Sequence, residues 1–100
     1  MFAVIYNFKV KPELDPEFQK LWHEGTLFIR QERNSLGSRF HKVSDGQFVA
    51  YALWPSREMW KNPAPSSPKL KETLAKMNSC LSETEVIFEL EVTDDLLIYE

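Results

Sequence analysis

The chain has 100 residues, 43% of them hydrophobic, and a formal net charge of −3 at pH 7. This length supports one domain over residues 1–100 with a single hydrophobic core, and the interspersed acidic and basic residues predict no nucleic-acid partner. Cys80 is the one cysteine and no stretch approaches the roughly 20 apolar residues of a membrane span, so we expect a cytoplasmic protein with no membrane partner.

The first predicted elements are a strand and a long helix. Residues 2–10 favour a strand because they are rich in β-branched and aromatic side chains. A helix is expected to begin with Asp15 as its N-cap and Pro16 at its first helical position, and to end near residues 33–34. Its apolar stripe is formed by Phe18, Leu21, Trp22, Gly25, Phe28 and Ile29.

A β-hairpin and a short helix are predicted next. Strands over residues 37–43 and 47–54 flank an Asp-Gly pair, which is the strongest short-range signal for a hairpin. Ser56 is expected to cap a short helix, in which Trp60 stands at the fourth position. That position predicts a hydrophobic staple between Trp60 and Pro55, the residue before the cap.

The chain ends with a second long helix and a last strand. Prolines within residues 62–68 end the short helix, and Ser67 is expected to cap a new helix that Pro68 begins. The apolar face of this helix is formed by Leu70, Leu74, Met77 and Leu81. Residues 85–92 alternate between apolar and mostly acidic side chains, which predicts a strand. The apolar face of that strand is Val86, Phe88, Leu90 and Val92.

The order of these elements predicts an α+β fold. A βαββαβ order is typical of the ferredoxin-like fold, with a four-stranded antiparallel sheet and helices on one face only. Strands 2–10 and 47–54 carry large apolar side chains on both faces, so the uncovered face would be more apolar than a soluble monomer usually shows. We therefore expect a homodimer, packed sheet on sheet into an α+β barrel.

Residues 37–60 resemble the antibiotic biosynthesis monooxygenase domain family. The matching features are the Gly-Ser-Arg start, the Asp-Gly hairpin and the strand end Ala-Tyr-Ala-x-Trp-Pro-Ser, and "DDLLI" near the C-terminus is similar to that family's tail. The resemblance implies a dimeric α+β barrel. It also implies one of the family's activities, which include cofactor-independent oxidation of aromatic polyketides and quinols, and degradation of haem.

The haem-degrading branch of the family matches this sequence only in part. That branch uses an Asn on the first strand, which Asn7 matches, and a Trp for which Trp60 lies about one helical turn early. Its iron-ligating His has no counterpart, because the helix that begins at Pro68 contains no histidine. We therefore expect no haem degradation and no cofactor.

Three polar residues are candidates for catalysis. Asn7 lies in an apolar strand and is a candidate to hydrogen-bond a phenol oxygen of a substrate, with a bond to a neighbouring loop or to solvent as the alternative. His41 is a candidate general base and Arg39 a candidate anion-binding group on the same face of a strand. The alternative for this pair is an ordinary exposed edge of the sheet.

Aromatic residues are candidates to bind a flat substrate. Trp54 and Trp60 would stack on its rings, although core packing is the favoured interpretation for each. Trp22 and Tyr51 are further candidates for the pocket, with a place in the dimer interface as the alternative for Tyr51. No metal site is expected, because the two histidines and Cys80 lack the spacing of metal ligands.

The sequence is compatible with two functions. The first is a small-molecule-binding dimer that acts as a cofactor-independent monooxygenase on an aromatic, quinol or polyketide-like substrate. The second is a non-catalytic ligand-binding or structural dimer. A cavity between helices and sheet with Asn7 pointing into it would favour the enzyme, and a cavity filled by the tryptophans would favour the second function.

Overall fold

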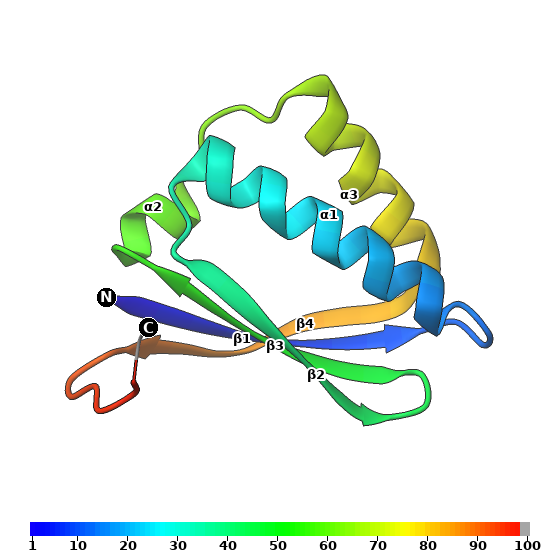
Figure 1. The fold of residues 1–100 in the computed structure, drawn as a ribbon, viewed down its shortest axis with the longest axis horizontal. Helices are drawn as coiled ribbons and strands as arrows, with labels where there is room; N and C mark the ends of the chain where they lie inside the picture. The colour runs from blue at the N-terminus through cyan, green and yellow to red at the C-terminus, as the bar shows by residue number, and fades with distance from the viewer. Residues whose placement is uncertain (99–100) are drawn as a thin grey trace.

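The computed structural model describes residues 1–98 and confirms the predicted order of elements. The elements are β1 (Phe2–Val10), α1 (Asp15–Arg33), β2 (Gly37–Ser44), β3 (Gln47–Trp54), α2 (Arg57–Lys61), α3 (Pro68–Cys80) and β4 (Leu81–Glu91). The strands form one antiparallel sheet in the order β2-β3-β1-β4, and the long helices α1 and α3 lie on one side of it (Figure 1). This is the expected α+β, ferredoxin-like fold.

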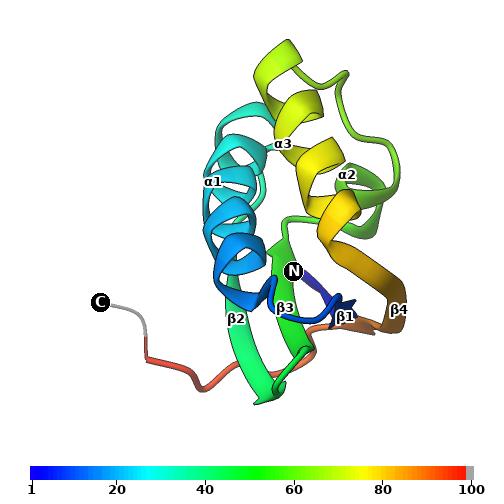
Figure 2. The ribbon, with the colours of Figure 1, turned by 90° about the vertical axis from the view of Figure 1, so that its right-hand side faces the viewer.

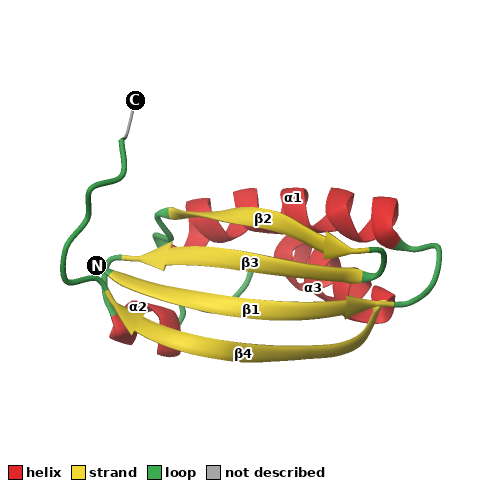
Figure 3. Cartoon of the chain, turned by 90° about the horizontal axis from the view of Figure 1, so that it is seen from below, coloured by secondary structure: helices red, strands yellow, loops and turns green. Residues whose placement is uncertain are grey.

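The sheet has one covered and one open face. Figure 2 shows α1 and α3 side by side on the same side of the strands, and Figure 3 shows the opposite face of the sheet in front of the helices. We call these the helix face and the open face. Among the described residues, only the end of the chain after β4 turns towards the open face, where Leu97 approaches β2 and β3.

The start of α1 differs from the prediction. Leu14, not Asp15, occupies the N-cap position and makes no side-chain cap, while Asp15 is the first helical residue. The Asp15 carboxylate instead accepts a hydrogen bond of 2.9 Å from the backbone N–H of Gly46, in the hairpin turn. The helix ends where expected, with Asn34 in the left-handed conformation at φ 57°.

The other predicted caps are confirmed. The Ser56 hydroxyl accepts a hydrogen bond from the Met59 backbone at the start of α2, and the Ser67 hydroxyl accepts one from Leu70 at the start of α3. On α3, Leu70 is fully buried, whereas Leu74 and Met77 are half-buried. The predicted apolar face is therefore only partly filled by the protein's own packing.

β4 departs most from the sequence-based expectation. It begins at Leu81, directly after α3, and not at residue 85. Val86 pairs with Tyr6 and Phe88 pairs with Ile5, so Ile87 is an extra residue that forms a bulge. Because side chains alternate along a strand, the bulge places Val86 on the helix face and Phe88 on the open face. The prediction that these two residues share a face is wrong.

Two hydrophobic clusters hold the helices to the sheet. The larger one is centred on Phe18 of α1, whose ring lies 5.2 Å from Phe8 and 6.3 Å from Phe48 between ring centroids. The smaller one contains Phe2, Val4, Ala52 and Trp54 and is packed against α2. Tyr6 packs against both clusters, and the site described next lies where they meet.

Candidate functional site

A cavity of about 330 Å³ lies between the helix face of the sheet and the long helices. It exists because β3 places small side chains between large ones: Ala50 and Ala52 lie between Phe48 and Trp54 on the helix face. Above them, Gly25 of α1 lines the cavity where α1 and α3 approach closely, since a Cβ at this position would lie 3.0 Å from Met77 Sδ. A volume of this size is at the lower end for small-molecule sites and suits a ligand of two or three rings.

Aromatic and aliphatic side chains form most of the cavity wall. Its lining comprises Tyr6, Phe8, Trp22, Gly25, Thr26, Ile29, Arg33, Ser35, Ser38, Ala50, Ala52, Trp54, Leu74, Met77, Asn78, Leu81 and Thr84. The half-buried Leu74 and Met77 of α3 are part of this wall, so the incomplete burial of the apolar face of α3 is explained by the cavity. Val86 lies on the helix face beside Tyr6 but is 42% exposed, so the helices leave the cavity side of β4 uncovered.

Two residues that line the cavity each carry a buried N–H group with no partner among residues 1–98. These groups are the indole Nε1 of Trp54 and the guanidinium Nε of Arg33. Arg33 also donates from Nη2 to the Ser66 hydroxyl, which holds the guanidinium at this end of α1. A buried donor without a partner costs about 1–3 kcal/mol, and a ligand oxygen is the kind of group that would remove this cost.

Tyr6 places a hydroxyl in the same cavity. The indole Nε1 of Trp60 donates a hydrogen bond of 2.7 Å to this hydroxyl. Burial raises the pKa of the Tyr6 phenol, and the Trp60 hydrogen bond and the charge of Arg33 oppose that rise only in part. Tyr6 is therefore a neutral phenol at physiological pH. No carboxylate or imidazole lines the cavity within the described chain.

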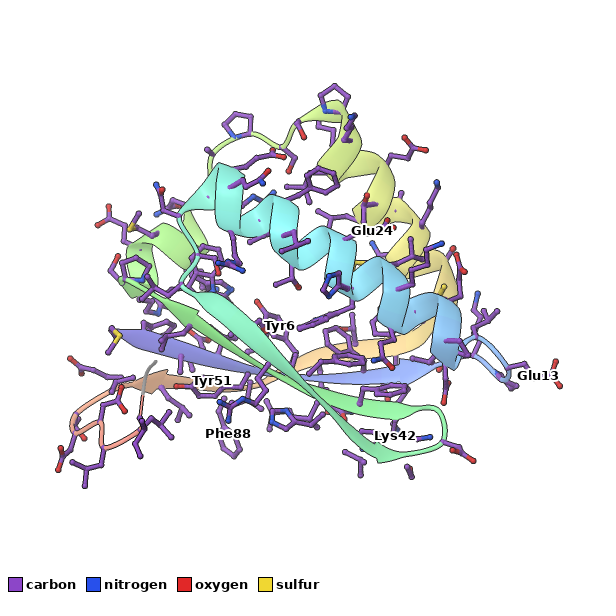
Figure 4. The ribbon with its side chains drawn as sticks, viewed as in Figure 1. Tyr6, Glu13, Glu24, Lys42, Tyr51 and Phe88 are labelled. Atoms are coloured by element: carbon purple, nitrogen blue, oxygen red, sulfur yellow. The ribbon has the colours of Figure 1, made fainter. Side chains whose placement is uncertain are left out.

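The structure separates the predicted site residues into two groups. Trp22 and Trp54 line the cavity, and Trp60 touches it only through its bond to Tyr6. Asn7 and Tyr51 lie on the open face, together with Arg39 and His41. Figure 4 shows Tyr6 on the helix side of the sheet, and Tyr51 on the opposite side.

Asn7 does not point into the cavity, because it is the neighbour of Tyr6 in a strand and faces the other way. Its side chain is buried on the open face, where its Oδ1 accepts a hydrogen bond of 3.1 Å from Gln47 Nε2. Asn7 is thus bonded to a side chain of β3, and not to a loop or to solvent as its alternative had it.

Arg39, His41 and Tyr51 line a separate groove of about 320 Å³ on the open face. The groove is also lined by Leu53 of β3 and by Leu97 of the C-terminal extension. His41 is exposed and its Nδ1 lies 3.0 Å from the carbonyl oxygen of Val49. The groove therefore brings together three of the predicted residues, but it does so across the sheet from the tryptophans.

Trp22 and Trp54 both pack against other side chains and line the cavity. Trp54 is only 5% exposed and belongs to a core cluster, while Trp22 stacks on Phe40 at 4.6 Å between ring centroids. Each nevertheless presents part of its ring to the cavity. The cavity is lined and not filled by these side chains, as expected for the enzyme. Asn7, which was expected to point into the cavity of an enzyme, lies on the open face instead.

Arg33 and Tyr6 are not among the site residues predicted from the sequence. Tyr6 shares the phase of Phe2 and Val4, which marks the helix face of β1, whereas the predicted Asn7 has the opposite phase. Arg33 stands at the end of α1, where a basic residue is common for its effect on the helix dipole. No sequence pattern indicated that its Nε would be buried.

The described residues contain neither a membrane-spanning helix nor a cluster of metal-ligating side chains. No helix is long and apolar enough to cross a membrane. No group of three or more His, Cys, Asp or Glu side chains within residues 1–98 is placed to hold a metal ion.

No protein-family model and no curated protein matches the sequence, whereas solved structures match it over nearly its whole length. The crystal structure of an antibiotic biosynthesis monooxygenase is 21% identical and covers 94% of this chain and 100% of its own, with a TM-score of 0.73. SnoaB, a cofactor-independent oxygenase from Streptomyces nogalater, is 15% identical, covers 95% of each chain and has a TM-score of 0.75. Rv0793 from Mycobacterium tuberculosis is 20% identical, covers 96% and 98%, and has a TM-score of 0.72. The α+β, ferredoxin-like fold of the single chain is therefore confirmed.

Proposed function

We propose that this protein is a cofactor-independent monooxygenase of the antibiotic biosynthesis monooxygenase type. Its substrate would be a flat aromatic compound of the phenol, quinol or polyketide class, bound in the cavity under α1. The observation that carries the proposal is an apolar cavity with partnerless N–H donors on Trp54 and Arg33. The fold shared with SnoaB supports the same reaction class.

The wall of the cavity suits flat rings that carry oxygen. Trp22 and Trp54 supply aromatic surface for stacking and burial. The donors on Arg33, Trp54 and Tyr6 call for acceptors on the ligand, such as a phenolate or a carbonyl oxygen. The positive charge of Arg33 would favour the ionised form of a bound phenol, because a nearby opposite charge lowers a pKa.

This arrangement is sufficient for oxidation by O2 without a cofactor. An electron-rich anion reacts with O2 directly, and the protein has to bind, orient and ionise it. In the reaction, a ring C–H of the phenol becomes a carbonyl: one oxygen atom of O2 stays on that carbon, and the other leaves as water with the hydrogen of that carbon and the phenol proton. The substrate supplies all four electrons, so the balance needs no other reductant.

A second candidate function is ligand binding without turnover. It is favoured by one observation: within the described chain the cavity lining contains no carboxylate or imidazole to act as a general base. His41, the predicted base, lines the groove on the open face instead. Under this alternative the same ligands would bind but would not be consumed.

We also propose that the protein is a homodimer that pairs through the open face. Phe88 is 57% exposed and Leu90 41% exposed on β4, and towards the other edge of the same face Leu97 lines the groove over β2 and β3. Obligate interfaces of this kind usually bury more than about 2,000 Å² in total. A second copy covering these side chains would remove an apolar patch that a soluble monomer rarely keeps. A cytoplasmic location stays a prediction from the sequence.

Oxygen consumption tests the proposed function. The purified protein would be screened against a panel of quinols and polyphenols with no cofactor added, and ligand binding would be measured in parallel by calorimetry. Ala52→Leu would fill the cavity floor, and we expect it to lower turnover by more than about 100-fold while keeping the fold. Ala75→Leu, on the exposed side of α3, is the matched control and should leave turnover unchanged.

The outcomes separate the two candidate functions. Turnover that Ala52→Leu abolishes supports the enzyme. Binding that Ala52→Leu abolishes, with no oxygen consumed by any substrate of the panel, supports the binding protein. Turnover that survives in Ala52→Leu would place the site elsewhere and contradict both.

A further inference from the structure

We propose that Trp60 is a positioning residue that makes the Tyr6 hydroxyl donate into the cavity, so that the site selects ligands with an acceptor oxygen. The inference rests on the proposed function in one respect, because it takes the cavity as the ligand site. It goes further by assigning the selection to a pair of residues, one of which does not touch the ligand.

The first step concerns the direction of the hydroxyl proton. An indole N–H only donates, whereas a phenol has one proton to donate and lone pairs that accept. Since Trp60 Nε1 lies 2.7 Å from the Tyr6 oxygen, the Trp60 proton occupies the space between them. The Tyr6 proton must therefore point away from Trp60.

The second step concerns what lies on the other side. Tyr6 lines the cavity, and its ring is stacked on Phe8 with an angle of 10° between the planes. This stacking fixes the ring plane in which the phenol proton prefers to lie. No acceptor within residues 1–98 takes that proton in a hydrogen bond, so it is free for a ligand. Because burial raises the pKa of Tyr6, the proton is present at physiological pH.

The third step concerns the rigidity of Trp60. Its ring lies 5.9 Å from Phe2 between ring centroids, and Lys61 Nζ lies 4.8 Å from the ring centroid. The helix that carries it is capped by the Ser56 hydroxyl. Trp60 is half-buried and is not part of the cavity lining. It is thus held in place without needing the ligand, as a residue that orients another should be.

Selection between ligands follows from the free-energy cost of leaving the Tyr6 hydroxyl without an acceptor. A ligand with an oxygen beside Tyr6 accepts the proton, whereas a ligand of the same shape without that oxygen leaves the donor buried and unpaired. One net hydrogen bond corresponds to about a tenfold difference in affinity. Without the Trp60 N–H the hydroxyl rotates freely, and part of this difference should be lost.

The experiment uses two probes that differ by one oxygen. Dissociation constants of 1-tetralone and of tetralin would be measured by ligand-observed NMR for the full-length wild type, Trp60→Phe, Tyr6→Phe and the double variant. The quantity of interest is the ratio of the tetralin constant to the tetralone constant. We expect Tyr6→Phe to lower this ratio about tenfold and Trp60→Phe to lower it about threefold. The double variant should match Tyr6→Phe, because the two residues act as a unit.

Asn7→Ala is the matched control, since Asn7 is the neighbour of Tyr6 on the other face of β1, and it should leave the ratio unchanged. Two results would overturn the inference. Trp60→Phe would weaken both probes equally if Trp60 only supports the fold. A further fall of the ratio on adding Trp60→Phe to Tyr6→Phe would show that Trp60 acts without Tyr6.

Failure of the proposed function would be recognised separately. If the wild type binds neither probe, the cavity is not a site for such rings and the proposed function is wrong. The orientation of Tyr6 is then decided by its pKa, measured by NMR of ring-labelled tyrosine and assigned with Tyr6→Phe. A hydrogen bond from Trp60 favours the phenolate, so Trp60→Phe must raise the pKa of Tyr6 further. An unchanged pKa would overturn the inference.

Discussion

The two faces of the sheet are built from the same strands and have different requirements. On the helix face, β1 presents Phe2, Val4 and Phe8, which are buried within one chain. On the open face, β4 presents Phe88 and Leu90, which remain exposed. The helix face is covered within a single chain except at the cavity and along β4, where Val86 is exposed. The open face is apolar and is left without cover by the described chain.

The difference shows that an apolar side chain contributes differently on the two faces of this sheet. On the helix face it contributes to folding directly, and the place where packing is incomplete, above Ala50 and Ala52, forms the cavity. On the open face it contributes only when another surface covers it. Changes to the two faces should therefore be detected by different measurements, namely unfolding for one and assembly for the other.

The largest expected effect is on the helix face. Phe18 is fully buried between α1 and the sheet, and Phe18→Ala should lower the free energy of unfolding by about 3–5 kcal/mol. Urea denaturation at fixed protein concentration would measure it. Leu27→Ala, on the exposed side of the same helix, is the control and should cost less than about 1 kcal/mol. Equal losses for the two variants would show that α1 is not held by this cluster.

A second, somewhat smaller effect is expected on the open face. Phe88→Glu would place a charge in the proposed interface, and we expect the dimer dissociation constant to rise by about 100-fold or more, which is about 2.7 kcal/mol. Sedimentation equilibrium of the two proteins would measure it. Leu27→Glu adds the same charge to an exposed residue of α1 and should not change assembly. A wild type that is monomeric at micromolar concentration would contradict the dimer itself.

The smallest expected effect is on the pH dependence of stability, and it concerns the hydrogen bonds between Glu32 of α1 and Ser67, the N-cap of α3. The Ser67 hydroxyl and backbone N–H donate to the Glu32 carboxylate at 2.7 and 2.8 Å, and they lower the pKa of Glu32. Because folding lowers this pKa, the carboxylate stabilises the fold fully above its ordinary pKa near 4.5, and the contribution is lost as the pH falls through the folded value. Glu32→Gln should therefore flatten the loss of stability between about pH 5 and 3.

Urea denaturation at several pH values would measure this slope. Glu24→Gln, an exposed change of the same charge on the same helix, is the control. A slope that Glu32→Gln leaves unchanged would show that the bond to Ser67 does not contribute in solution.

The fold was predictable because its signals are local. The hairpin follows from Asp-Gly between alternating strands, and the starts of α2 and α3 follow from Ser56 and Ser67, which the structure confirms as caps. Asp15 was misassigned for a reason that is not local. Its carboxylate is engaged by Gly46, which is distant in the sequence and comes near only when the sheet has formed.

The site was predicted less well because residue type was given more weight than strand phase. Asn7 attracted attention as a polar residue in an apolar strand, but the cavity lies on the face that Tyr6 shares with Phe2 and Val4. The period of two groups Tyr6 with Phe2 and Val4, but it does not say which face of the sheet carries the cavity. The partnerless N–H groups of Arg33 and Trp54 depend on packing between distant elements, and no pattern along the chain reports them.

The bulge in β4 also determines where this strand tolerates a change of length. Val86 and Phe88 face neighbouring residues of β1, so deleting Ile87 would join two segments that are already in register. No other side chain of β4 would then change face. If Glu89 were deleted instead, the residues between Ile87 and the deleted position would have to shift by one residue relative to β1 to restore regular pairing. This shift would move Phe88 to the helix face. Single-residue length variation in this edge strand should therefore be tolerated best where its pairing with β1 already shifts, at Ile87 and at Ser82.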